Sequence, residues 1–205
     1  IRYNQGMETQ RIHDLLERIA ALLRASEWAV AKAHGLQPVH LHSLHYLSRC
    51  NRYSSTPAAL TAYLGATKGT VSQTLIVLEG RGLIEKRTDF RDKRHVRLNL
   101  TSAGTRVLRE CVPPPIFRNA CADADSLGAS LDALLRRMQR ASGQTAFGIC
   151  GTCMHFRRNA LGKRHQCGLT LEPLSAREST LICREHVDPP SADPGGSDES
   201  MAATH

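Results

Sequence analysis

Long hydrophobic runs and aromatic residues are both scarce in this chain. Phe, Trp and Tyr together make up 4% of its 205 residues. No stretch approaches the roughly 20 consecutive apolar residues that a membrane-spanning helix needs. No basic segment leads into an apolar core followed by a small-residue cleavage site, as it would in a secretory signal. We therefore expect a cytoplasmic protein that has no membrane partner.

Patterns that carry enzyme chemistry are also lacking. The sequence contains no glycine-rich phosphate cradle, no nucleophile–base constellation and no paired carboxylate site. We therefore predict that the chain is not an enzyme. A thiol-redox enzyme that works through its clustered cysteines is the less favoured alternative.

Positive charge, in contrast, is abundant and unevenly placed. The formal net charge is +8. Between Leu36 and Glu110 there are twelve Lys and Arg residues against five Asp and Glu residues, so nearly all of the excess lies in this segment. Such a concentration is typical of a surface that binds the phosphates of a nucleic acid.

The N-terminal part of the chain has the pattern of a long amphipathic helix. Residues 1–6 precede Met7 and resemble the remnant of a protease site, so they are left out of the predicted fold. Residues 7–35 place apolar side chains at helical spacing on one face, namely Ile12, Leu15, Leu16, Ile19, Leu22 and Leu23. Gly35 is a natural stop for this helix.

The next segment predicts a helix-turn-helix. Pro38 suits the first turn of a helix that runs to about Arg49. Thr56, followed by a proline, is a good N-cap for a short helix that ends near Leu64. Thr67 can cap a further helix over 68–80. Two short helices joined by a tight turn that contains glycine form a helix-turn-helix.

A β-hairpin is expected directly after these helices. Residues 83–88 and 95–100 alternate as strands do, and the strongly polar segment 89–94 lies between them. Such a hairpin is a wing. Thr101 can cap a helix to about Cys111, where Pro113–Pro115 must stop or bend it. Residues 36–111 are therefore predicted as a winged helix-turn-helix domain.

Two groups of polar residues in this domain are candidates for contacting double-stranded DNA. The early residues of a recognition helix face base edges and phosphates in the major groove; here they are Thr67, Lys68, Thr70, Ser72 and Gln73. The wing tip can enter a minor groove or clamp the backbone, and it carries Arg91, Lys93, Arg94 and His95.

The same residues make the sequence resemble the MarR family of bacterial regulators. The resemblance is carried by residues 64–75, by residues 78–84, by the wing sequence Asp89-Phe90-Arg91-Asp92-Lys93-Arg94 and by residues 98–104, and it covers about Glu8 to Ser142. It implies a homodimer on a pseudo-palindromic operator, paired through the first and last helices. The last helix would be residues 116–142, with an apolar stripe of Leu127, Leu131, Leu134, Leu135 and Met138. The Pro113–Pro115 break departs from the family pattern.

A cysteine-rich module is predicted over residues 147–186. Four cysteines have the spacing Cys150-x2-Cys153-x13-Cys167-x15-Cys183. Thiolates at such spacings bind zinc or an iron–sulfur cluster. Three histidines lie close enough in sequence to replace a cysteine or to support one, namely His155, His165 and His186. The segment 187–205 is rich in Pro, Gly, Ser, Asp and Ala and is predicted to be disordered.

Two identities for the metal remain open. Structural four-cysteine zinc sites are often built from two C-x-x-C pairs, and this module has one, which favours an iron–sulfur cluster and leaves zinc as the alternative. A cluster predicts a sensor of iron, redox state or nitric oxide, whereas zinc predicts a structural site beside a small-molecule effector. The predicted fold is thus mainly α with a small β wing, completed by dimerisation helices and a C-terminal Cys-rich metal-binding module.

Overall fold

The computed structural model describes residues 2–88, 96–121, 124–143 and 147–189. Its N-terminal part contains α1 (Arg2–Ala33), α2 (Pro38–Arg49), α3 (Pro57–Leu64), α4 (Lys68–Gly80), β1 (Ile84–Thr88), β2 (Val96–Leu100) and α5 (Ser102–Cys111). Two more helices follow, α6 (Pro115–Ala120) and α7 (Ala124–Ser142). The C-terminal part contains β3 (Gly148–Ile149), a 3-10 turn η1 (Cys150–Thr152), β4 (Phe156–Leu161), β5 (Arg164–Cys167), β6 (Pro173–Leu174), α8 (Ala176–Ser179) and β7 (Ile182–Cys183).

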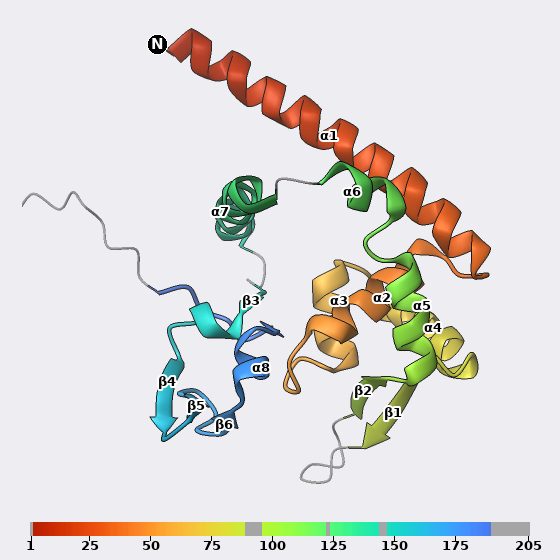
Figure 1. Cartoon of the computed structure of the whole chain (residues 1–205), viewed down its shortest axis with the longest axis vertical. Helices are drawn as coiled ribbons and strands as arrows, with labels where there is room; N and C mark the ends of the chain where they lie inside the picture. The colour runs from red at the N-terminus through yellow and green to blue at the C-terminus, as the bar shows by residue number, and fades with distance from the viewer. Residues whose placement is uncertain (1, 89–95, 122–123, 144–146, 190–205) are drawn as a thin grey trace, which may run out of the picture.

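Helix α1 is longer than predicted and projects away from the other elements (Figure 1). It begins at Arg2, so the boundary expected at Met7 does not mark the start of the helix. It ends where Gly35 takes a left-handed backbone conformation with φ of 64°, which glycine adopts at little cost because it has no Cβ.

Helices α2 to α5 and the hairpin surround one hydrophobic core. The predicted caps are present, because Thr56 accepts a hydrogen bond from the backbone of Ala59 and Thr67 accepts one from Thr70. The side chains at the centre of this core are almost fully buried and include Leu41, Leu44, Leu60, Val71, Leu78 and Leu98. The predicted helix-turn-helix is therefore confirmed, with α3 and α4 as its two helices.

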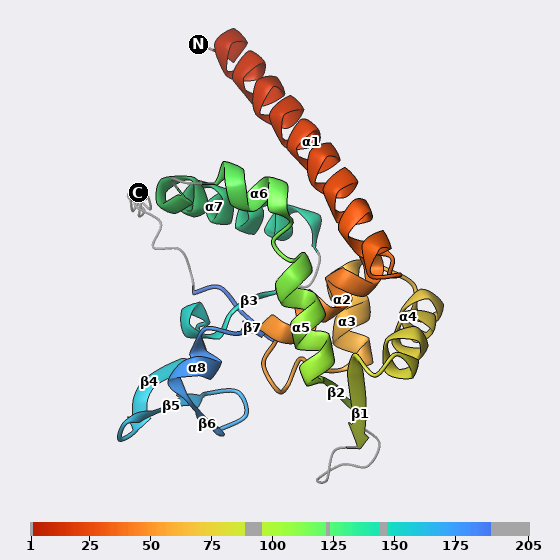
Figure 2. The ribbon, with the colours of Figure 1, turned by 45° about the vertical axis from the view of Figure 1, so that its right-hand side comes forward.

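Strands β1 and β2 form the base of the predicted wing. They pair in antiparallel register, with Ile84 opposite Leu100 and Thr88 opposite Val96. Leu98 points into the core, which agrees with the predicted alternation along this strand. The hairpin lies at the end of the molecule opposite the N-terminal end of α1 in both ribbon views (Figures 1 and 2).

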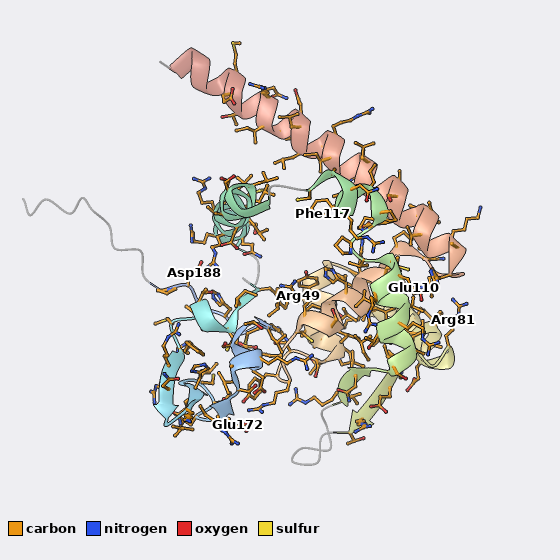
Figure 3. The ribbon with its side chains drawn as sticks, viewed as in Figure 1. Arg49, Arg81, Glu110, Phe117, Glu172 and Asp188 are labelled. Carbon is orange, nitrogen blue, oxygen red and sulfur yellow. The ribbon has the colours of Figure 1, made fainter. Side chains whose placement is uncertain are left out.

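The single helix predicted over 116–142 is wrong, because this region forms two helices. Helix α6 runs over Pro115–Ala120, and the next residue, Cys121, leaves the helical region with backbone angles of φ −99° and ψ 68°. Helix α7 begins at Ala124. The apolar stripe predicted from the sequence lies on α7. Helix α6, on which Phe117 is labelled in Figure 3, packs beside α1.

The cysteine module contains two small antiparallel sheets and docks on the winged helix. Strand β3 pairs with β7, and β5 lies between β4 and β6. Cys50, at the end of α2, forms a parallel bridge with Ile182 of β7. At its other end the module contacts α7, where Asp188 forms ion pairs with Arg136 and Arg140. The module is thus connected to both helical parts of the molecule.

None of the helices in the described part of the chain is long and apolar enough to cross a membrane.

Candidate functional site

Helix α4 separates a buried apolar face from an exposed polar one. Val71, Thr74, Leu75 and Leu78 face the core. The residues predicted to contact DNA on this helix are all exposed, namely Thr67, Lys68, Thr70, Ser72 and Gln73. At its N-terminus the hydroxyl oxygens of Thr67 and Thr70 lie 2.9 Å apart, which holds the first turn in place. The free backbone N–H groups of this turn and the helix dipole favour a phosphate here.

The predicted wing-tip residues Arg91, Lys93, Arg94 and His95 lie outside the described residues. The described strands place two further cations at the base of the wing. Lys86 pairs with Glu79 of α4 at 2.6 Å, and Arg87 pairs with Glu85 at 2.8 Å. The first of these ion pairs connects the hairpin to the recognition helix.

The four predicted cysteine ligands line one cavity. The strand pairs explain how they meet, because Cys167 lies opposite Phe156 in the β4–β5 pair and Cys183 lies opposite Gly148 in the β3–β7 pair. The 3-10 turn η1 then places the remaining two cysteines beside these strands. The cavity is lined by Tyr53, Cys150, Cys153, His155, Phe156, Cys167, Leu169, Thr170, Cys183 and Glu185.

The three histidines near these cysteines differ in position. His155 lines the cavity. The ring of His165 packs against Phe156 with centroids 4.9 Å apart, and its Nδ1 accepts a hydrogen bond from the backbone of Asn159. His186 is buried with its Nε2 3.1 Å from the hydroxyl of Thr152, in the turn between the first two cysteines. His155 is thus placed as a fifth candidate ligand, and His186 is placed to support the turn.

Burial dominates the electrostatics of the cysteines. Burial, and to a smaller extent the neighbouring thiols of Cys183, Cys167 and Cys153, raise the pKa of Cys150 to about 12. Burial also raises the pKa of Cys183, although the Asn51 side chain, the Glu185 backbone and the Ser54 side chain act in the opposite direction. Burial thus favours the neutral thiol at Cys150 and Cys183, whereas a bound cation would favour the thiolate.

The residues around the cavity fit a metal centre in their chemistry. Four sulfurs face an otherwise mostly apolar cavity, and the backbone N–H of Val187 donates to Cys153 Sγ at 3.5 Å. Among the described residues, however, no three His, Cys, Asp or Glu side chains are already drawn together as ligands of one metal ion. The donor set therefore suits a thiolate-bound centre in its chemistry.

Three residues of the site come from a segment that sequence reasoning missed. Asn51, Tyr53 and Ser54 belong to the loop between α2 and α3, about a hundred positions before the first cysteine of the module. Tyr53 lines the cavity, and the side chains of Asn51 and Ser54 lower the pKa of Cys183 against the effect of its burial. Nothing in the spacing of the cysteines points to this loop. The only available signal was its polar composition between two well-defined helices.

Comparison with known proteins agrees with the geometry of the winged helix. A model of the MarR family matches residues 34–95. This segment is similar to the winged helix of the MarR family. The transcriptional repressor MprA of Escherichia coli (strain K12) is 34% identical over 83 residues, which cover 40% of this chain and 47% of the repressor. The chain thus spans about half the length of this curated relative.

Solved structures give the same fold. The MarR family transcription regulator SP03579 is 20% identical with a TM-score of 0.53, over 67% of this chain and 95% of that one. The transcriptional regulator BldR of Sulfolobus solfataricus is 18% identical with a TM-score of 0.52, over 65% of this chain and 96% of that one. Both likenesses concern the fold, and each leaves about a third of this chain uncovered.

Outside the winged helix, α1 and α7 carry apolar faces that remain exposed in the single chain. On α1 these are Ile12, Leu15, Ile19 and Leu22, and on α7 they are Leu127, Leu131, Leu135 and Met138. Both helices lie on the side of the molecule away from the hairpin (Figure 2). Contiguous apolar surface of this kind on a monomer marks an interaction site.

Crevices between the helices offer room for a small molecule. One is lined by residues of α1, α2, α5 and α6, among them Leu23, His45, Leu108 and Phe117. Another lies between α2, α3 and α7 and is lined partly by His42, Tyr63 and Leu135. Both contain apolar walls with a few polar groups, which is the usual character of a ligand pocket.

Proposed function

We propose that the chain is a MarR-type transcriptional regulator that binds double-stranded DNA as a homodimer on a pseudo-palindromic operator. The observation that carries this proposal is the exposed polar face of α4, a capped helix within a winged helix that a model of the MarR family matches. Its five polar residues can read base edges and contact phosphates while the opposite face stays in the core. The cations predicted at the wing tip would add contacts to the backbone.

The test of DNA binding uses Lys68, which is exposed in the first turn of α4. Replacing it with Ala removes a phosphate contact, so we expect affinity for a DNA fragment selected by the wild-type protein from a random library to fall severalfold, with a salt slope shallower by about one. Fluorescence anisotropy at several salt concentrations measures both. Arg18→Ala, on an exposed position of α1, removes the same charge far from the hairpin. Equal behaviour of the two variants would contradict the proposed interface.

The dimer is proposed from the exposed apolar faces of α1 and α7. A second copy of the chain has the same two faces, and pairing them through a two-fold axis removes both from water. Two copies of α4 would then be presented about one turn of DNA apart, as a palindromic operator requires.

We also propose that Cys150, Cys153, Cys167 and Cys183 hold an iron–sulfur cluster, with zinc as the second candidate. Zinc bonds sulfur at about 2.3 Å and would draw four sulfurs into close mutual contact. A cluster spreads its four cysteine ligands over the corners of a larger inorganic core. The four sulfurs share one cavity and include a single C-x-x-C pair, whereas structural zinc sites are often built from two such pairs, so the cluster is favoured.

The metal identity decides the sensing mechanism. A cluster would supply sensitivity to iron, redox state or nitric oxide, and the chain would answer by a shift between DNA-binding geometries. Zinc would stabilise the module, and a small-molecule effector in the helix crevices would then control DNA binding. The raised pKa of Cys150 argues against this cysteine as the nucleophile of a thiol-redox enzyme, because a reactive cysteine needs a lowered pKa.

Anaerobic purification tests the metal. We expect a coloured protein with iron and sulfide, and we expect Cys167→Ser to lose both. Cys121→Ser is the matched control, because Cys121 lies at the end of α6 outside the cavity. A colourless protein with one zinc per subunit would overturn the cluster and support the structural site. Retention of metal by the Cys167→Ser variant would contradict the proposed ligand set.

A further inference from the structure

The loop between α2 and α3, residues 50–56, connects the cysteine module to the winged helix. We call it the connecting loop. The backbone N–H of Asn51 donates to the carbonyl of Ile182 at 2.8 Å, and the backbone N–H of Arg184 donates to the hydroxyl of Ser54 at 2.9 Å. These bonds hold the residues on both sides of Cys183 against the loop. A movement of Cys183 would therefore also displace the loop.

The side-chain amide of Asn51 is held in one orientation, with its nitrogen on the side of the module. Its Oδ1 accepts hydrogen bonds from the backbone N–H groups of Tyr53 at 3.1 Å and Ser54 at 3.0 Å. Turning the amide over would set its NH₂ group against two other donors, which is unfavourable. The orientation of this side chain is thus determined by the loop itself.

The donor end of Asn51 is buried and unsatisfied. The residue is 1% exposed, and its Nδ2 has no hydrogen-bond partner among the described residues. Its neighbour on the module side is Cys183, because the loop binds the residues directly before and after this cysteine, Ile182 and Arg184. A neutral thiol is a poor acceptor, whereas a thiolate bound to a metal is a good one. The amide of Asn51 is therefore placed to donate a hydrogen bond to a thiolate at Cys183 rather than to a neutral thiol.

The opposite side of the connecting loop holds the wing. Arg97 of β2 donates through Nη1 to the carbonyls of Arg52 at 2.7 Å and Tyr53 at 3.2 Å. The backbone N–H of Leu98 donates to the carbonyl of Ser55 at 2.8 Å. The loop ends at Thr56, the cap of α3. Its carbonyls thus fix one strand of the wing, and its last residue begins the helix-turn-helix.

Side-chain contacts brace the same loop against the module. Arg52 forms ion pairs with Glu172 at 3.2 Å and Glu178 at 3.0 Å, and the hydroxyl of Tyr53 donates to Glu172 at 2.8 Å. Figure 3 labels Glu172 on the module. Because Tyr53 also lines the cysteine cavity, the loop contacts the cavity, the module surface and the wing at once.

We infer that Asn51 donates a hydrogen bond to the sulfur of Cys183 when that sulfur is metal-bound, and that the connecting loop thereby couples occupancy of the cysteine site to strand β2 of the wing. This inference rests on the metal site proposed above and specifies its regulation. Loading satisfies the buried donor and tightens the loop. Loss of the metal returns Cys183 to a neutral thiol, so the Asn51 donor loses its acceptor. The connecting loop then supports strand β2 of the wing less firmly.

The test compares the full-length protein with and without its metal by hydrogen exchange. In the wild type we expect loading to slow exchange in peptides covering 50–56 and 96–100 by roughly threefold or more, because both segments lose local opening. Asn51→Asp keeps an acceptor for the two loop N–H groups and removes the donor. This variant should load metal at the wild-type ratio but lose the change in 96–100.

A spectroscopic readout separates this role from a merely structural one. Loss of a donor to sulfur and gain of a carboxylate should lower the midpoint potential of a cluster, or shift the sulfur-to-cobalt absorption if cobalt(II) is loaded in place of zinc. Lys163→Gln, at an exposed position next to Gly162 in the β4–β5 hairpin, changes the charge of the module equally and should leave both readouts unchanged.

The outcomes distinguish the two proposals. A wild-type protein that takes up neither iron nor zinc through its cysteines overturns the metal site and the coupling together. Metal uptake without a change of hydrogen exchange in 96–100 overturns the coupling alone. The same holds if Asn51→Asp shows the wild-type change in exchange together with the wild-type potential or absorption. A folding defect in Asn51→Asp would change the thermal unfolding of the unloaded protein. It would not produce a change in hydrogen exchange that depends on metal loading, so it cannot imitate the expected result.

Discussion

At the scale of single residues, close approach decides which positions tolerate change. Gly104 lies in the first turn of α5, where a Cβ would meet the carbonyl oxygen of Leu83 and the side chain of Leu100. Gly80, at the end of α4, has open space where a Cβ would lie. The two glycines look alike in sequence, and only the first is required by the packing of α5 against the hairpin.

We therefore expect Gly104→Ala to lower the free energy of unfolding by about 1–3 kcal/mol, because the backbone of α5 must move away from β1. Gly80→Ala should be neutral or stabilise slightly, because alanine loses less backbone entropy than glycine in a helix. Urea denaturation followed by circular dichroism measures both variants. If both variants lost a similar free energy of unfolding, the contact with Leu83 would not be the cause of the loss in Gly104→Ala.

At the scale of elements, local capping fixes where the recognition helix begins. The Oγ1 of Thr67 accepts a hydrogen bond from the N–H of Thr70 at 3.1 Å and also contacts its hydroxyl. This arrangement satisfies one of the free donors at the helix start. Helix α4 is therefore a rigid element before any DNA is bound.

Thr67→Ala should cost about 1 kcal/mol of stability through the lost cap, whereas Thr67→Ser keeps the oxygen and should cost much less. Urea denaturation measures this pair as well. If both substitutions cost the same, the methyl group rather than the hydroxyl of Thr67 would be the stabilising part. The cap would then not explain the start of α4.

At the scale of the whole molecule, the exposed apolar faces of α1 and α7 need a partner. Leu131→Glu places a charge within the α7 stripe, so we expect dissociation to a monomer at micromolar concentration, since burying an unpaired carboxylate is unfavourable. Ala129→Glu, two positions away and on the opposite side of α7, is the matched control. Sedimentation velocity measures the oligomeric state. A wild-type monomer, or a dimer in both variants, would contradict pairing through this stripe.

Much of the fold was predictable because it depends on local chemistry. Thr56, Thr67 and Thr101 are cap residues whose hydrogen bonds reach only three positions along the chain, and each predicted helix start was found. The division into α6 and α7 was not predicted, because the backbone turn at Cys121 has no proline or glycine to mark it. The convergence of the four cysteines on one cavity followed from their spacing, although the metal did not.

By itself, the sequence determined the winged helix, the polar face of α4 and the grouping of the cysteines, because caps, periodicity and spacing act over a few residues. The tertiary structure decided where the cysteine module lies. Docking of β7 on the connecting loop brings Asn51 to Cys183, 132 positions later in the chain. Such a contact depends on packing between distant segments, and no local pattern records it. This docking is what connects the cysteines to the wing.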